Sequence, residues 1–249
     1  MHWLPLTLLM LAGIANAPAS ASTPEPFPGY TATYEASVFG NTLTVQSTLS
    51  HEGENLRMAM DAHVSGYLRL LGRFEFNRET LFQVDGTEIR PLQSRSVQIT
   101  PRRERRVETR FDWTSGRAQG RVGQDHFDLE VPEGTQDFLS SIYLTMDALR
   151  RGALENVMQV TILERTRLRS YRMGREGTER LDTALGRFDT VQITRRDADS
   201  DVALSSWFAK DLGYLPVRLD YEADGSIYQL NLTRLEWHDP LTAPGTDSR

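Results

Sequence analysis

Residues Glu179–Ile193 read ERLDTALGRFDTVQI, and residues Trp207–Tyr221 read WFAKDLGYLPVRLDY. In both stretches, apolar and polar residues alternate on either side of a turn that contains a glycine, Gly186 in the first and Gly213 in the second. Alternation with a period of two is typical of β-strands that have one buried and one solvated face. The two stretches therefore predict four paired strands joined by short turns. Proline cannot donate a hydrogen bond to a β-ladder, so the strand that contains Pro216 is expected to lie at a sheet edge or to begin there.

The same alternation continues through most of the chain. Asp85-Gly86 is a strong two-residue hairpin signal between two such segments. No spacing typical of βαβ units is present, so the strands are expected to pair with their neighbours in an antiparallel sheet. So many strands favour a mainly β fold, a strongly curved sheet or half-open β-barrel. The segments that we predict to be strands are residues 30–38, 42–51, 56–64, 75–84, 89–100, 105–113, 117–122, 126–131, 157–164, 167–175, 177–182, 186–196, 203–211, 215–223 and 226–237.

One segment has the period of a helix instead. Between Asp137 and Arg151, apolar residues recur every three or four positions, which predicts a single α-helix at about residues 137–151. Thr135 or Asp137 can cap its N-terminus, and Gly152 can end it. A lone amphipathic helix must bury its apolar side, and the concave face of the curved sheet is the place we expect. The residues of this stripe are Leu139, Ile142, Tyr143, Met146 and Leu149.

Length and composition exclude several classes of protein. The chain has 249 residues, of which 39% are hydrophobic, and residues 30–238 are expected to form a single β-rich domain. Its net charge of −6 gives no reason to expect a nucleic-acid partner. The absence of cysteine excludes disulfides, thiol chemistry, lipid attachment of the lipoprotein kind and most structural zinc sites.

The N-terminus reads as a cleaved signal peptide over residues 1–21. A short apolar core from Leu4 to Leu11 is followed by the cleavage motif Ala19-Ser20-Ala21. The apolar run is too short to span a bilayer, which requires about 20 apolar residues, so no stable membrane span is expected after cleavage. A periplasmic location follows. Residues 22–29 form a Pro-rich lead-in, and the polar tail at residues 239–249 is expected to be disordered.

Several short motifs carry a family resemblance. They are Tyr30-x-Ala32-x-Tyr34, Phe111-Asp112-Trp113, Pro132-x-Gly134-x-Gln136-Asp137, Glu179-x-Leu181-x-Thr183-x-Leu185-Gly186, and Trp207-Phe208-Ala209-x-Asp211 followed by Pro216-Val217-Arg218. Through these motifs the chain resembles the exported bacterial family called domain of unknown function 3108, from Tyr30 to about Trp237. The resemblance implies the fold and export but no activity. A looser resemblance to periplasmic lipoprotein carriers, through Trp207, Asp211 and Pro216, implies an open β-barrel with a helical lid.

No motif for catalysis is present. The histidines lie far apart in the sequence without metal-ligand spacing, and there is neither a G-x-S-x-G elbow nor a glycine-rich phosphate loop. We therefore assign no catalytic or metal-binding residue and expect no cofactor. The one local basic run, residues 102–106, is interpreted as a solvated hairpin end, with contact to anionic lipid or glycan as the alternative.

A short apolar segment bracketed by Gly66 and Gly72 breaks the alternation. It could be a lid beside a hydrophobic groove or a loop buried in the core, and on the first interpretation its residues would contact a ligand. These candidate ligand-binding residues are Tyr67, Leu68, Leu70, Leu71 and Phe74.

These features favour non-enzymatic binding of an apolar or amphipathic, lipid-like component of the cell envelope in the concavity of the sheet. The first alternative is a protein-interaction or assembly module that uses exposed sheet edges. The second alternative is an enzyme acting on glycans or lipids, which would need a polar cleft with two facing carboxylates.

Overall fold

The computed structural model describes residues 27–38, 40–67, 74–197, 203–223 and 226–238. Besides the strands it contains the helix α1 (Phe138–Arg150) and the short 3₁₀ helix η2 (Lys210–Leu212). The strands are β1 (Tyr30–Val38), β2 (Asn41–Glu52), β3 (Asn55–Val64), β4 (Glu75–Asp85), β5 (Glu88–Thr100), β6 (Arg103–Asp112), β7 (Arg117–Val122), β8 (Asp125–Glu130), β9 (Val157–Glu164), β10 (Arg167–Thr183), β11 (Gly186–Asp197), β12 (Ala203–Ala209), β13 (Leu215–Ala223) and β14 (Ser226–Trp237).

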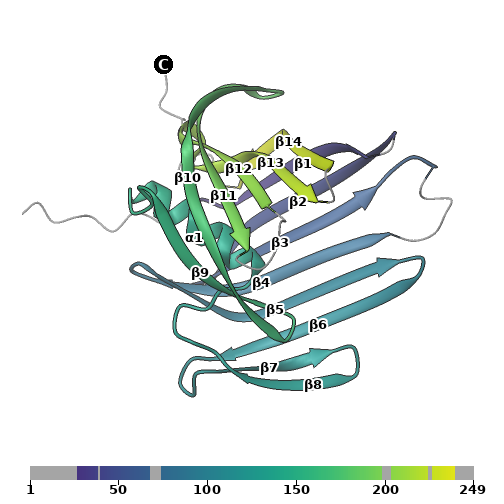
Figure 1. Cartoon of the computed structure of the whole chain (residues 1–249), viewed down its shortest axis with the longest axis vertical. Helices are drawn as coiled ribbons and strands as arrows, with labels where there is room; N and C mark the ends of the chain where they lie inside the picture. Colours follow the sequence, from purple (N-terminus) through teal and green to yellow (C-terminus); the bar gives the residue numbers. More distant parts are fainter. Residues whose placement is uncertain (1–26, 39, 68–73, 198–202, 224–225, 239–249) are drawn as a thin grey trace, which may run out of the picture.

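Over the described residues, the strands form one antiparallel sheet in the order β8-β7-β6-β5-β4-β3-β2-β1-β14-β13-β12-β11-β10-β9. The sheet curls so that β9 to β14 lie across the broad layer made by β1 to β8, with α1 between them (Figure 1). The helix contacts β3, β4 and β5 on one side and β9 on the other. The sheet is not closed, and β8 and β9 are its edges. The prediction of a mainly β fold with a curved antiparallel sheet and one packed helix is confirmed.

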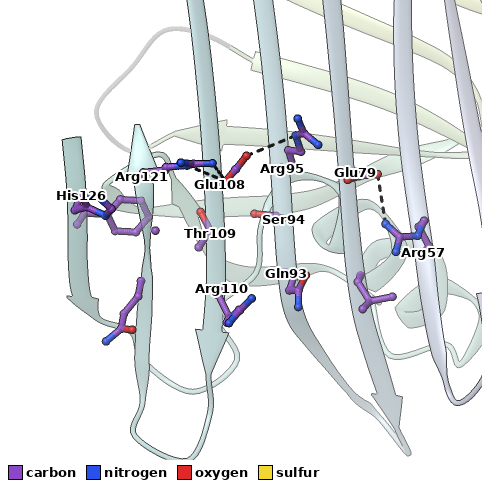
Figure 2. Close-up of a pocket in the computed structure, with 14 residues that line it drawn as sticks. Arg57, Glu79, Gln93, Ser94, Arg95, Glu108, Thr109, Arg110, Arg121 and His126 are labelled. Atoms are coloured by element: carbon purple, nitrogen blue, oxygen red, sulfur yellow. Dashed lines mark hydrogen bonds and ion pairs between the residues drawn. The ribbon is translucent and has the colours of Figure 1, made fainter. Parts of the chain in front are cut away.

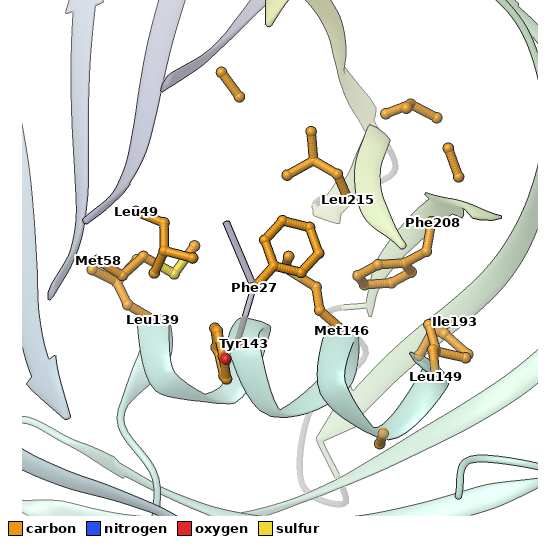
Figure 3. Close-up of a cluster of buried hydrophobic side chains, with 14 of the residues drawn as sticks. Phe27, Leu49, Met58, Leu139, Tyr143, Met146, Leu149, Ile193, Phe208 and Leu215 are labelled. Atoms are coloured by element: carbon orange, nitrogen blue, oxygen red, sulfur yellow. The ribbon is translucent and has the colours of Figure 1, made fainter. Parts of the chain in front are cut away.

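The core lies between α1 and the concave face of the sheet. Figure 3 shows the apolar stripe of the helix, including Leu139, Tyr143 and Met146, directed at side chains from both halves of the sheet. All three side chains are at most 2% exposed. Because the helix occupies the concavity, most of the interior of the half-barrel is filled with protein. Sheet residues that belong to this core include Leu49, Met58, Phe82, Ile193, Phe208, Leu215 and Leu232.

Two strands, β10 and β13, differ from what the local sequence pattern predicts. Residues 167–175 and 177–182, predicted as separate strands, belong to the single strand β10, in which a register shift at Gly177 accommodates the break. The expectation of an edge strand at Pro216 is wrong, because β13 lies inside the sheet between β12 and β14. The alternative expectation, that the strand begins near Pro216, is confirmed, since β13 begins at Leu215. A β-bulge in the pairing with β12 provides a place where the missing N–H of proline is tolerated.

Candidate functional site

The concavity has one end at which the odd-numbered strands β3, β5, β9, β11 and β13 finish. Antiparallel pairing places these strand ends along the same end of the sheet. The first residue of α1, Phe138, contacts side chains of β4 and β11. The N-terminal end of the helix therefore meets both halves of the sheet.

A short segment before α1 fixes the helix in this place. The backbone N–H of Gln136 donates to the Thr161 carbonyl oxygen on β9, at 2.8 Å, and its side-chain amide donates to the Ile89 carbonyl oxygen on β5, at 2.8 Å. Asp137 then caps the helix by accepting from the backbone N–H of Ser140, at 2.8 Å. Residues 136–137 thus join β9 to β5 and position Phe138 at the end of the helix.

Beside the helix lies a small pocket of about 40 Å³. One wall is the side of α1 that carries Ile142, and the opposite wall is the inner face of β10 to β13. The two helix hydroxyl groups in it are already satisfied, since Ser141 and Thr145 donate to carbonyl oxygens of the helix. The remaining lining is mostly apolar and comprises Met173, Ile193, Arg195, Leu204, Ser206, Phe208, Pro216 and Leu219.

Two guanidinium groups pack on Phe138, the first residue of α1, and one of them, that of Arg195, lines the pocket. Arg78 on β4 lies 4.4 Å from the centroid of the Phe138 ring, and Arg195 on β11 lies 5.4 Å from the same centroid. Arg195 also lies 4.7 Å from the centroid of the Tyr171 ring and lines the pocket itself. Within the described residues, neither arginine forms an ion pair, because no carboxylate oxygen lies within 4.0 Å of either one.

The acidic groups nearby are engaged elsewhere. Glu164 accepts a hydrogen bond from the Tyr171 hydroxyl at 2.6 Å and lies 3.6 Å from Arg169. Asp197 pairs with Arg169 at 2.5 Å. Arg169 therefore contacts both carboxylates. Among the described residues, the guanidinium groups of Arg78 and Arg195 have no carboxylate in contact, although Asp137 and Glu164 act on Arg78 from a greater distance.

Burial acts on the two arginines in the same direction. Desolvation lowers the pKa of Arg78, and the neighbouring positive charges of Arg195 and Arg165 lower it further, against Asp137 and Glu164. Desolvation likewise lowers the pKa of Arg195. Both remain charged at neutral pH, because an arginine pKa lies far above it. By solvent exposure, Arg195 is half-buried and Arg78 is exposed. Arg195 is therefore the more dehydrated of the two cations, and an anion could replace the hydration that it has lost.

Of the residues singled out from the sequence, Tyr67 and Phe74 lie at the same end of the sheet but do not line this pocket. Tyr67 follows the end of β3 and is 54% exposed, and Phe74 precedes β4 and is half-buried. Leu68, Leu70 and Leu71 lie outside the described residues. The two arginines were missed, although a signal exists: Val191, Ile193 and Arg195 share one face of β11, so the alternation predicts an inward-pointing charge.

Two further kinds of feature are absent from the described part of the chain. It contains no cluster of three or more His, Asp or Glu side chains suited to hold a metal ion. None of its helices has the length and apolar character needed to cross a membrane.

Comparisons with known proteins agree with this fold. The model of a family described as proteins of unknown function, DUF3108, matches residues 30–233. A β-barrel-like protein of domain of unknown function DUF1849 from Brucella abortus has a similar structure, with a TM-score of 0.58 and 11% identity over 86% of this chain and 99% of the other. A suspected lipoprotein from Parabacteroides distasonis aligns over 84% of this chain and 97% of its own at 10% identity, but its TM-score of 0.32 is too low to carry an argument. No curated protein matches the sequence.

Proposed function

The chain belongs to the DUF3108 family, and we propose from the geometry of its pocket that it is a non-enzymatic binding protein for an anionic amphiphile. Such a ligand has an acidic head group and an apolar tail. The observation that carries the proposal is the pair Arg78 and Arg195, which have no carboxylate in contact among the described residues and pack on the same Phe138 ring, with Arg195 lining an apolar pocket.

The head group would lie between the two arginines. A hydrogen bond to a charged group contributes roughly 1.5–3 kcal/mol, and a guanidinium presents a planar fork that matches a carboxylate or a phosphate. Phe138 holds both groups against one ring and limits their freedom before the ligand arrives. Binding therefore requires little rearrangement of these side chains.

The size of the pocket restricts the tail. A volume of about 40 Å³ is far below the roughly 300–1,000 Å³ of a typical ligand pocket, so only the end of a chain would enter. The rest would lie on partly exposed apolar side chains that continue from the pocket along β12 and β13, namely Leu204, Leu219 and Tyr221. A ligand with a single chain, similar to a fatty acid, fits these limits better than a lipid with several chains.

Assembly through sheet edges receives less support. Edge strand β8 carries Asp125, Asp128 and Glu130, and charged residues on an edge strand oppose pairing with another strand. On the other edge, Gln136 already forms backbone hydrogen bonds with β9.

The proposal includes export. We infer that residues 1–21 are a cleaved signal peptide, so that the protein meets its ligand in the periplasm. N-terminal sequencing of protein from the envelope fraction is expected to begin at or within a few residues of Ser22. Recovery of Met1 would contradict this part of the proposal.

A fluorescence titration with dansylundecanoic acid tests the site. Arg195→Gln is expected to weaken binding about tenfold, which corresponds to about 1.4 kcal/mol. The matched control is Arg196→Gln, because Arg196 is the next residue on β11 and points to the opposite face, where it is exposed. The neutral methyl ester of the probe should bind the wild type about as weakly as the acid binds Arg195→Gln. Equal binding of acid and ester, or equal losses in both variants, would contradict the proposal.

A further inference from the structure

A second hollow lies on the opposite side of the sheet. A groove of about 650 Å³ crosses β3 to β8, and its lining side chains are shown in Figure 2. It faces away from α1: Thr80 reaches the helix cap at Asp137, and its neighbour Glu79, which lines the groove, points to the other face of β4. This groove is separate from the pocket of the proposed function, and its volume is within the usual range for a ligand site.

Charges alternate across the groove in a single row. Glu79, Arg95, Glu108, Arg121 and His126 stand directly opposite one another on β4 to β8. Glu108 lies between two arginines, 2.7 Å from Arg121 and 3.8 Å from Arg95. One carboxylate therefore neutralises only part of two positive charges.

The balance of charge in the groove is positive, whereas the chain as a whole carries −6. Its lining contains four arginines against two glutamates. Arg110 is exposed and has no ion pair anywhere in the described ranges, and its cross-strand neighbours are the neutral amides Gln93 and Gln119. Arg110 therefore adds a positive charge that the surface ion pairs of the row do not neutralise.

We propose that this groove binds an acidic oligosaccharide. Arg110 and the half-compensated Arg95 and Arg121 would hold the acidic groups of the sugar. Arg95 and Arg121 stand two strands apart, which is about 9.5 Å, so they suit acidic groups that are spaced along a chain.

The neutral and acidic groups of the groove select the saccharide over other polyanions. Gln93 and Gln119 can both donate to and accept from sugar hydroxyls, and Glu79 and Glu108 can accept from them. The same two carboxylates would repel the dense phosphates of a nucleic acid or an anionic membrane. A ligand with hydroxyl donors and well-separated charges matches this lining.

Calorimetric titration with hexagalacturonate at low ionic strength tests the inference. Arg110→Gln should weaken binding about tenfold and leave the melting temperature unchanged, because Arg110 is exposed and has no ion pair to lose. Arg121→Gln should weaken it to a similar extent. The matched control, Arg187→Gln, removes the same charge from an exposed position on β11, outside the groove, and should bind like the wild type. Neutral maltohexaose should bind at least tenfold more weakly than hexagalacturonate.

Three results would overturn the inference. The first is no binding of hexagalacturonate to the wild type, and the second is an equal loss in Arg110→Gln and Arg187→Gln, which would reveal unspecific charge attraction. The third is binding to phosphatidylglycerol vesicles that depends on Arg110 while hexagalacturonate does not bind, which would assign the groove to a membrane surface. None of these outcomes depends on Arg195, so they test the groove independently of the proposed amphiphile site.

Discussion

The two faces of the sheet hold arginine in opposite ways. On the inner face, Arg78 and Arg195 pack on an aromatic ring, Arg195 is half-buried, and the nearby carboxylates of Glu164 and Asp197 pair with Arg169 instead. On the outer face, Arg95 and Arg121 share Glu108 and are 52% and 54% exposed. The inner pair suits one desolvated head group next to an apolar chain, whereas the outer row suits a long hydrated ligand. The difference comes from the surroundings of the arginines and not from their number.

The strongest contrast between the faces is expected in stability. Phe208 is 4% exposed and lies in the core beside the inner pocket, so Phe208→Ala should lower the free energy of unfolding by roughly 3–5 kcal/mol. Leu81 lines the outer groove and is only partly buried, so Leu81→Ala should cost about 1 kcal/mol. Urea unfolding of the two variants measures both. Equal losses in the free energy of unfolding would contradict the expectation that the inner face is more deeply buried than the outer face.

A smaller effect is expected in alkaline solution. Burial on the inner face raises the pKa of Tyr30 from 10.0 to about 12. The unfolded chain then releases this proton first, so the stabilisation is fully present below pH 10 and is lost as the pH rises from 10 through about 12. A pKa difference of two between the folded and the unfolded chain corresponds to roughly 3 kcal/mol of stability. Only part of this stability is lost by pH 11, because that pH lies below the pKa of Tyr30 in the folded chain. Unfolding of Tyr30→Phe at pH 9 and pH 11 should show a shallower fall than the wild type. An equal fall in stability between pH 9 and pH 11 in both proteins would show that Tyr30 does not cause the alkaline loss of stability.

The smallest effect is expected on the outer face. Glu108→Gln breaks two exposed ion pairs, so stability should change by less than about 1 kcal/mol, and less still at high salt. The same substitution frees Arg95 and Arg121, and hexagalacturonate should therefore bind more tightly. Calorimetry and thermal unfolding at two salt concentrations check both signs. A large loss of stability would show that the row is structural and not available to a ligand.

Local features of the structure were largely predictable from the sequence. The strand Tyr30–Val38 and the hairpin between β4 and β5 follow from alternation and turn chemistry, although the two turn residues are Gly86 and Thr87, one position after the predicted Asp85-Gly86. The helix differs from its predicted bounds by one residue at each end. The pairing of β1 with β14 could not be predicted, because it joins Tyr30 to Trp237 and no local pattern records a contact so distant in the chain.

The candidate site was harder to predict than the fold. An apolar segment such as the one after Tyr67 stands out in a sequence, whereas a single inward-pointing arginine does not. Arg78 and Arg195 are separated by more than a hundred residues and contact the same ring only because α1 places Phe138 between β4 and β11. The distinction between paired and unpaired arginines also depends on contacts across the sheet, which composition cannot reveal.

The binding of an anionic amphiphile between Arg78 and Arg195 can be observed directly by NMR. The side-chain Nε–Hε signals of the arginines would be followed during a titration with dodecanoate and, in parallel, with dodecanol. The signals of Arg78 and Arg195 should shift with dodecanoate in a saturable way and shift much less with dodecanol, while those of Arg95 and Arg121 stay in place. Unchanged signals of Arg78 and Arg195, or equal shifts with the neutral alcohol, would contradict an anion site between the two arginines.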